Sequence, residues 1–120
     1  MMITGKIVSG VGESSEWMPK YISWLYPGTL NVYLELPIDH NFKWIKIIDT
    51  HYKKPAKIAS CLINAEEAFI ILPPLANKIK HPNLIEIGAS FNIRKRFNLN
   101  NNDLVTLNLN NNDLVTITII

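Results

Sequence analysis

Thr29 and Asn31 stand two residues apart in the stretch G-T-L-N, which runs into V-Y-L-E-L. Residues at positions i and i+2 of a strand point to the same face, so a hydroxyl and an amide oxygen are expected side by side. Such hard oxygen ligands suit a magnesium ion that keeps its waters and takes further ligands from phosphates. Gly28 would let a ligand approach the backbone closely. The alternative is the polar outer face of a half-buried strand.

A glycine-containing stretch, S-G-V-G-E-S-S at residues 9–15, follows the first run of β-branched residues. Its two glycines allow the backbone to fold around an anion with N–H groups pointing inward. The stretch lacks the lysine that a phosphate-binding P-loop requires, and an ordinary glycine turn is the alternative.

Two charged stretches later in the chain add further candidates. Glu86 stands between Ile85 and Ile87, so on a strand it is expected to face away from them. The sequence F-N-I-R-K-R at residues 91–96 predicts a basic helix that could meet phosphate. Solvated side chains are the alternative for both stretches.

The elements that must position these residues are mostly strands. Apolar and alternating runs predict strands over residues 2–8, 29–36, 42–48, 56–63, 67–72 and 84–88. An irregular helix interrupted by Pro19 is expected over 15–25, and a helix N-capped by Ser90 over 91–97. Short strands with turn signals and one or two short helices indicate a mostly β fold, a small closed or nearly closed barrel.

The tail contains a tandem repeat. Residues 98–107 read N-L-N-N-N-D-L-V-T-L, and residues 108–117 read N-L-N-N-N-D-L-V-T-I. Each copy has the composition of a turn followed by a strand, because asparagine tolerates left-handed backbone. The two copies predict a hairpin with Asn110, Asn111 and Asn112 at its tip. A recent duplication without function is one interpretation. The other is that the added strand covers an edge or pairs with another chain as an edge-strand dimer.

Composition narrows the class of protein. The chain of 120 residues predicts a single domain, 1–120, and a net charge of +2 is too small to argue for nucleic acid. The lone cysteine, Cys61, excludes an internal disulfide and is expected to be a buried, inert thiol. No apolar run approaches a membrane span and the start lacks a signal-peptide pattern, so the cytoplasm is the expected location.

In their order, these stretches resemble the archaeal-type CTP-dependent riboflavin kinase family. The matching pieces, within about residues 2–107, are S-G-V-G-E-S, G-T-L-N-V-Y-L, I-E-I-G-A-S, N-I-R and N-N-D-L-V. The resemblance implies a six-stranded cradle-loop barrel related to RIFT barrels, here with an extra C-terminal hairpin strand. It also implies an enzyme that transfers the terminal phosphoryl of CTP to the 5′-hydroxyl of riboflavin, giving FMN and CDP.

The resemblance assigns roles to residues. Magnesium would be held by Thr29 and Asn31, and flavin would be contacted by Glu86 and Lys80. Glu86 is also the candidate catalytic base, with Glu13 as the alternative. The residues implied to bind the nucleotide are Gly10, Val11, Gly12, Glu13, Ser14, Ser15, Phe91, Asn92, Ile93 and Arg94, of which Arg94 is the natural phosphate partner.

The sequence departs from the family pattern at three places. Ser14 replaces a glycine of the first loop, and Gly88 and Ser90 stand where the family has isoleucine and proline beside its glutamate. The D-G-D turn is N-N-D here. A barrel that binds flavin or nucleotide without catalysis is therefore the alternative function.

A second alternative comes from another class of protein. The piece F-N-I-R-K-R-F-N-L-N-N-N-D-L-V-T-I also resembles the helix and turn of AbrB-type swapped-hairpin transcription factors, which bind DNA as dimers. Those domains are about half this length and lack a counterpart of G-T-L-N, and the net charge is small for DNA binding.

Overall fold

The protein is a β-barrel with one short helix among the residues that its structure describes. The computed structural model describes residues 2–9, 26, 29–36, 46–48, 56–72, 83–109 and 115–120. Its elements are β1 (Met2–Val8), β2 (Leu30–Leu34), β3 (Lys46–Ile48), β4 (Ala56–Ile63), β5 (Glu66–Leu72), β6 (Leu84–Gly88), α3 (Ile93–Arg96), β7 (Leu104–Leu109) and β8 (Val115–Ile119). No helix among these residues is long and apolar enough to cross a membrane.

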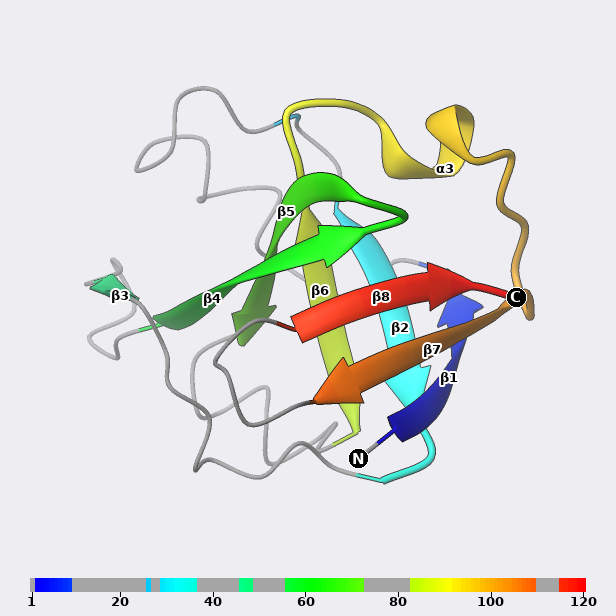
Figure 1. Ribbon diagram of the computed structural model, residues 1–120, viewed down its shortest axis with the longest axis horizontal. Coiled ribbons are helices and arrows are strands. Elements are labelled where there is room, and N and C mark those ends of the chain that lie inside the picture. Colours follow the sequence, from blue (N-terminus) through cyan, green and yellow to red (C-terminus); the bar gives the residue numbers. More distant parts are fainter. Residues whose placement is uncertain are drawn as a thin grey trace.

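Seven strands form the closed ring of the barrel. The strand order is β3-β4-β5-β6-β2-β1-β7-β8, and β8 also pairs with β4, so the ring runs from β4 through β8 while β3 lies outside it along β4 (Figure 1). All neighbours are antiparallel except β4 and β8, which are parallel. The prediction of a mostly β barrel is confirmed, but the expected ring of six strands is wrong.

The seventh strand of the ring comes from the second copy of the repeat. The two copies form the expected antiparallel pair, β7 and β8, and Leu107 lies opposite Ile117, its counterpart ten residues later. On its other side, β8 pairs with β4 through Val115 to Ile117. The added strand therefore covers an edge, as one interpretation held. Because Val115 to Ile117 are paired on both sides, this part of β8 has no free edge for a second chain. The hairpin tip lies outside the described residues.

The core lies inside the ring and follows the alternation of the strands. In β1, Ile3, Gly5 and Ile7 point inward and are buried, whereas Met2 and Lys6 are exposed. A Cβ atom on Gly5 would lie 2.7 Å from Cγ1 of Val32, so glycine allows β1 and β2 to approach closely inside the barrel. The two repeat copies contribute equivalent side chains to this core, namely Val105, Leu107, Val115 and Ile117.

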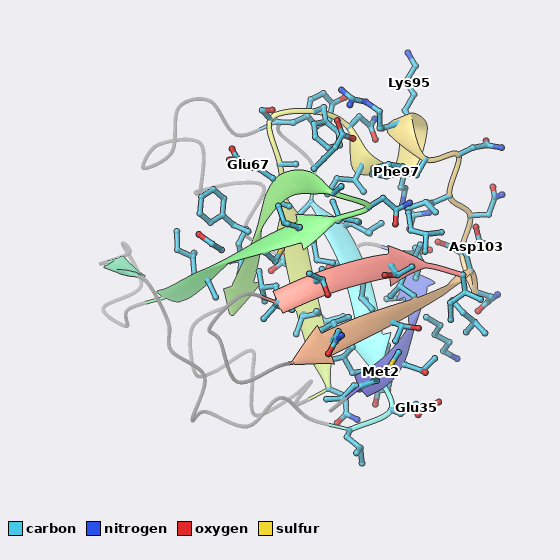
Figure 2. The ribbon with its side chains drawn as sticks, viewed as in Figure 1. Met2, Glu35, Glu67, Lys95, Phe97 and Asp103 are labelled. Carbon is cyan, nitrogen blue, oxygen red and sulfur yellow. The ribbon has the colours of Figure 1, made fainter. Side chains whose placement is uncertain are left out.

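The helix begins two residues later than expected. Asn92, not Ser90, is the N-cap of α3, because the Asn92 Oδ1 atom accepts a hydrogen bond of 3.2 Å from the Lys95 backbone N–H. The basic residues do lie in the last turn, as expected. Figure 2 shows Lys95 extending away from the barrel. The irregular helix expected over 15–25 lies outside the described residues.

Cys61 is the buried, inert thiol that the sequence predicts. It lies on β4 opposite Val115 of β8 and is 2% exposed. Burial raises the pKa of this thiol from 9.0 to about 12. It therefore stays protonated and unreactive at neutral pH.

Candidate functional site

Asn31 and Glu86 face each other across two neighbouring strands. In the antiparallel pairing of β2 and β6, Asn31 lies opposite Glu86, and in the pairing of β1 and β2 Asn31 lies opposite Val8. These three residues form one row across the barrel wall, hereafter the Val8–Asn31–Glu86 row. Their neighbours in β2 and β6, including Leu30 and Ile87, point into the core, so the row lies on the outer side of the wall.

The two polar residues of this row are nevertheless buried. Asn31 is 4% exposed and Glu86 is 0% exposed. The alternative of a solvated glutamate is therefore wrong. Asn31 does lie on the outer face of its strand, as the other alternative held, but it is covered there. Period-two alternation predicts which face of a strand a residue takes, but it does not show whether that face is covered.

Thr29 contacts Glu86 directly, just before β2 begins. The Thr29 hydroxyl donates a hydrogen bond of 2.8 Å to Oε1 of Glu86, across 57 residues of sequence. A hydroxyl has one proton and two acceptor lone pairs, so this bond uses the proton and leaves oxygen lone pairs available. The expected arrangement, with Thr29 and Asn31 on the same side of β2, is consistent with their shared neighbour Glu86.

The side-chain amide oxygen of Asn31 is an unsatisfied hydrogen-bond acceptor. Its Oδ1 atom is buried and has no hydrogen-bond partner among the described residues. Leaving a buried acceptor unsatisfied costs on the order of 1–3 kcal/mol. Native proteins accept that cost rarely, and a bound ligand is one reason for it.

These donors fit a magnesium ion. The Thr29 hydroxyl oxygen and Asn31 Oδ1 are hard oxygen ligands, and the carboxyl group of Glu86 lies beside them. Within the described parts of the chain, no group of three or more His, Cys, Asp or Glu lies together. The donor set therefore differs from the nitrogen and sulfur ligands that zinc prefers.

Helix α3 is attached to the same row. The guanidinium Nη2 of Arg94 donates a hydrogen bond of 2.8 Å to the carbonyl oxygen of Val8. Tyr26, three residues before Thr29, donates its backbone N–H to the carbonyl of Ala89 at 2.8 Å. The Asn92 side chain donates to the Tyr26 hydroxyl at 3.3 Å. The start of β2, the end of β6 and α3 thus meet at one end of the barrel (Figure 1).

Some of the other residues expected to contact the nucleotide lie in the described part of the chain, and some lie outside it. Phe91 packs edge-to-face against Phe97, with 6.2 Å between ring centroids, and the guanidinium of Arg96 lies 4.1 Å from its ring centroid. Arg96 also forms an ion pair with Glu66. Ile93 is 2% exposed within the core, so a contact with a ligand would involve its backbone. Gly10, Val11, Gly12, Glu13, Ser14, Ser15 and Lys80 lie outside the described residues.

Sequence reasoning missed two residues of this region. The Asn101 side chain contacts both Arg94 and Ser9, and Tyr26 connects the start of β2 to α3. Asn101 belongs to the N-N-D turn, which stands where the family has D-G-D, and this position in the family pattern was the available signal. It was assigned only to a turn, because asparagine is common in turns.

Comparison with known proteins finds a matching family model and several related proteins. The family model CTP-dep_RFKase, described as "Domain of unknown function DUF120", matches residues 7–109. A protein named riboflavin kinase from Methanoculleus marisnigri is 30% identical over 86% of this chain and 54% of its own length. Riboflavin kinases from Staphylothermus marinus and Pyrococcus furiosus are each 28% identical over 88% of this chain, and over 88% and 57% of their own lengths.

Two of these three relatives are much longer than the part that aligns. The chain spans about half the length of the Methanoculleus and Pyrococcus relatives and most of the Staphylothermus relative. The family match begins at Ile7, near the end of β1, includes β2, β6 and α3, and ends where β7 ends. On this match, the chain belongs to the CTP-dependent riboflavin kinase family.

Proposed function

We propose that this protein phosphorylates riboflavin, transferring the terminal phosphoryl group of CTP to the 5′-hydroxyl and releasing FMN and CDP. The names of the relatives support riboflavin as substrate, and the name of the family supports CTP as donor. The observation that carries the proposal is the group formed by the half-buried Thr29 and the buried Asn31 and Glu86. This group contains a hydrogen bond of 2.8 Å and an unpartnered amide oxygen, and Asn31 and Glu86 are the polar residues that are buried in the described part of the chain.

Phosphoryl transfer asks a protein mainly for positioning and for neutralisation of charge. Thr29 and Asn31 would hold magnesium, which supplies charge neutralisation at the phosphate oxygens when it is bound. Arg94 would pair with a phosphate from the other side, since a guanidinium binds phosphate through two parallel N–H donors. Residues 10–15 would provide backbone N–H groups to the nucleotide.

Glu86 has two roles in this proposal. It accepts a hydrogen bond from the Thr29 hydroxyl and would so orient the Thr29 oxygen toward its ligand. It would also contact the flavin and accept the proton of the ribityl 5′-hydroxyl as that oxygen attacks phosphorus. One carboxylate can serve both partners because it offers about four lone-pair sites on two oxygens.

The AbrB-type alternative is not supported by the comparisons. The family model covers residues 7–109, about twice the span of an AbrB-type domain, and includes the G-T-L-N stretch that such a domain lacks. In addition, β7 and β8 pair with strands of their own chain.

The test is an incubation of the purified protein with riboflavin and magnesium, and with either CTP or ATP, followed by chromatography for FMN and nucleotide diphosphate. The proposal expects equal amounts of FMN and CDP, with CTP as the effective donor. Formation of FMN with ATP but not with CTP would keep the kinase and reject the donor. Quenching of riboflavin fluorescence without FMN would identify a barrel that binds flavin but does not catalyse.

A further inference from the structure

The Asn101 side chain joins two segments that are far apart in the sequence. Its Oδ1 atom accepts a hydrogen bond of 2.8 Å from Nη2 of Arg94, and its Nδ2 atom donates one of 2.8 Å to Oγ of Ser9. An amide can accept and donate at the same time, which a carboxylate cannot do. Ser9 directly precedes Gly10, where the expected nucleotide loop begins, and Arg94 belongs to the second expected nucleotide contact.

The turn that presents Asn101 is held by backbone bonds that do not involve its side chain. The Asn102 N–H donates to the carbonyl of Ile7 at 2.7 Å, and the Ile7 N–H donates to the carbonyl of Asp103 at 2.9 Å. Oδ2 of Asp103 accepts from the Asn100 N–H at 2.7 Å. Asn102 has a φ of 72°, a left-handed conformation that asparagine tolerates. The turn therefore keeps its place on β1 without the Asn101 amide.

Asn101 fixes Arg94 without neutralising it. In the part of the chain that the structure describes, the hydrogen-bond partners of the Arg94 guanidinium are an amide oxygen and a backbone carbonyl, both of them neutral. The neighbouring Arg96 differs, because it is paired with the carboxylate of Glu66. Arg94 therefore keeps its full positive charge in a fixed position beside the Val8–Asn31–Glu86 row, where an anionic ligand would meet it.

We propose that Asn101 is a positioning residue for the nucleotide, which holds the guanidinium of Arg94 and the side chain of Ser9 in place. This inference rests on the proposed function. It adds a residue that touches neither substrate and acts through Arg94 and Ser9. It also gives the first copy of the repeat a role that the second copy does not share.

The repeat provides a matched control. Asn101 and Asn111 occupy the same position in identical N-L-N-N-N-D-L-V-T sequences, but Asn111 lies beyond the residues that the family model matches. The variants are Asn101→Ala, Asn101→Asp and Asn111→Ala. Each is titrated with CDP and magnesium by calorimetry, titrated with riboflavin by fluorescence quenching, and unfolded in urea.

Loss of the two hydrogen bonds in Asn101→Ala is expected to raise the Kd for CDP about tenfold. The Kd for riboflavin and the urea midpoint should stay as in the wild type. Asn101→Asp keeps an acceptor for Arg94 but loses the donor to Ser9, and it restores the first aspartate of the family's D-G-D turn, so its Kd for CDP should rise less than that of Asn101→Ala. Asn111→Ala should bind CDP like the wild type.

Unchanged CDP affinity in Asn101→Ala would overturn the inference. A parallel loss of riboflavin affinity or of stability would also overturn it, because the residue would then be structural. A wild type that binds riboflavin but no CDP would instead reject the proposed donor site itself.

Discussion

Two antiparallel strand pairs of the same barrel differ in what they bury. The β7–β8 hairpin, built from the two repeat copies, buries apolar side chains such as Leu107 and Ile117, which lie opposite each other. The β2–β6 pair buries an amide opposite a carboxylate, Asn31 and Glu86. Burial of the first pair stabilises the fold, whereas burial of the unsatisfied Asn31 oxygen in the second pair opposes it. A place where a fold gives up stability in this way is where function is expected.

The comparison predicts that a charge inside the β7–β8 hairpin has the largest effect on folding. Ile117→Asp would place a carboxylate at a position that is 1% exposed and lies opposite both Leu107 and Ile63. An unpaired buried charge should remove most of the free energy of unfolding, which is on the order of 5–15 kcal/mol for a domain. Urea unfolding followed by circular dichroism measures this.

Thr118→Asp is the matched control for that variant, since Thr118 is the next residue of β8 and is exposed. Its urea midpoint should stay close to that of the wild type. If Ile117→Asp folds as stably as Thr118→Asp, then β8 does not close the barrel.

The β2–β6 pair should respond in the opposite way. Glu86→Gln keeps the size of the side chain and an oxygen that can accept from Thr29, so the urea midpoint should stay close to that of the wild type. Turnover of riboflavin should fall about 100-fold or more, the usual contribution of a general base. The two measurements are made on the same preparation.

Glu67→Gln is the control for the charge change, because Glu67 is exposed on β5 (Figure 2). It should retain the turnover of the wild type. Glu86→Gln that is less stable and fully active would mean that Glu86 serves the fold and not the reaction.

The smallest effect on the free energy of unfolding is expected from substitution of Cys61, which lies on β4 beside the hairpin. Its pKa is about 12 in the folded chain against an ordinary 9.0, so only the unfolded thiol ionises between these values. Its contribution to stability is complete below pH 9.0 and is lost as the pH rises toward 12. Between about pH 8 and pH 10, the free energy of unfolding should therefore fall by about 1 kcal/mol less in Cys61→Ala than in the wild type.

Urea unfolding of both proteins at the two pH values gives this difference. Equal losses in the wild type and in Cys61→Ala would show that the thiol is not desolvated in the folded state. Turnover should be the same in both proteins at neutral pH, because Cys61 lies outside the proposed site.

Most strands could be predicted from the sequence because their cause is local. The run of β-branched and apolar residues over 2–8 coincides with β1, and the run over 56–63 with β4. The positive φ of Asn98 and Asn102 agrees with the turn expected in the first repeat copy. The placement of Thr29 and Asn31 on one side of a strand follows from period two alone.

What could not be predicted depends on pairing between distant segments. The contact between Asn31 and Glu86 depends on the register of β2 with β6. The burial of these two side chains depends on what covers the outer face of the barrel wall. Ser90 and Asn92 are both good capping residues, and the contacts around α3 decide between them. The place of β8 beside β4 depends on closure of the whole ring.

The central claim is that the fold accepts an unsatisfied Asn31 because its oxygen binds a cation, and Asn31→Leu tests it most directly. Mn²⁺ replaces Mg²⁺ as a paramagnetic probe, since both prefer oxygen ligands. Its binding in the presence of CDP is measured by electron paramagnetic resonance, and the variant is unfolded in urea alongside the wild type. The account predicts that Asn31→Leu binds Mn²⁺ about 10- to 100-fold more weakly and is at least as stable as the wild type. Unchanged Mn²⁺ affinity together with lower stability would contradict it.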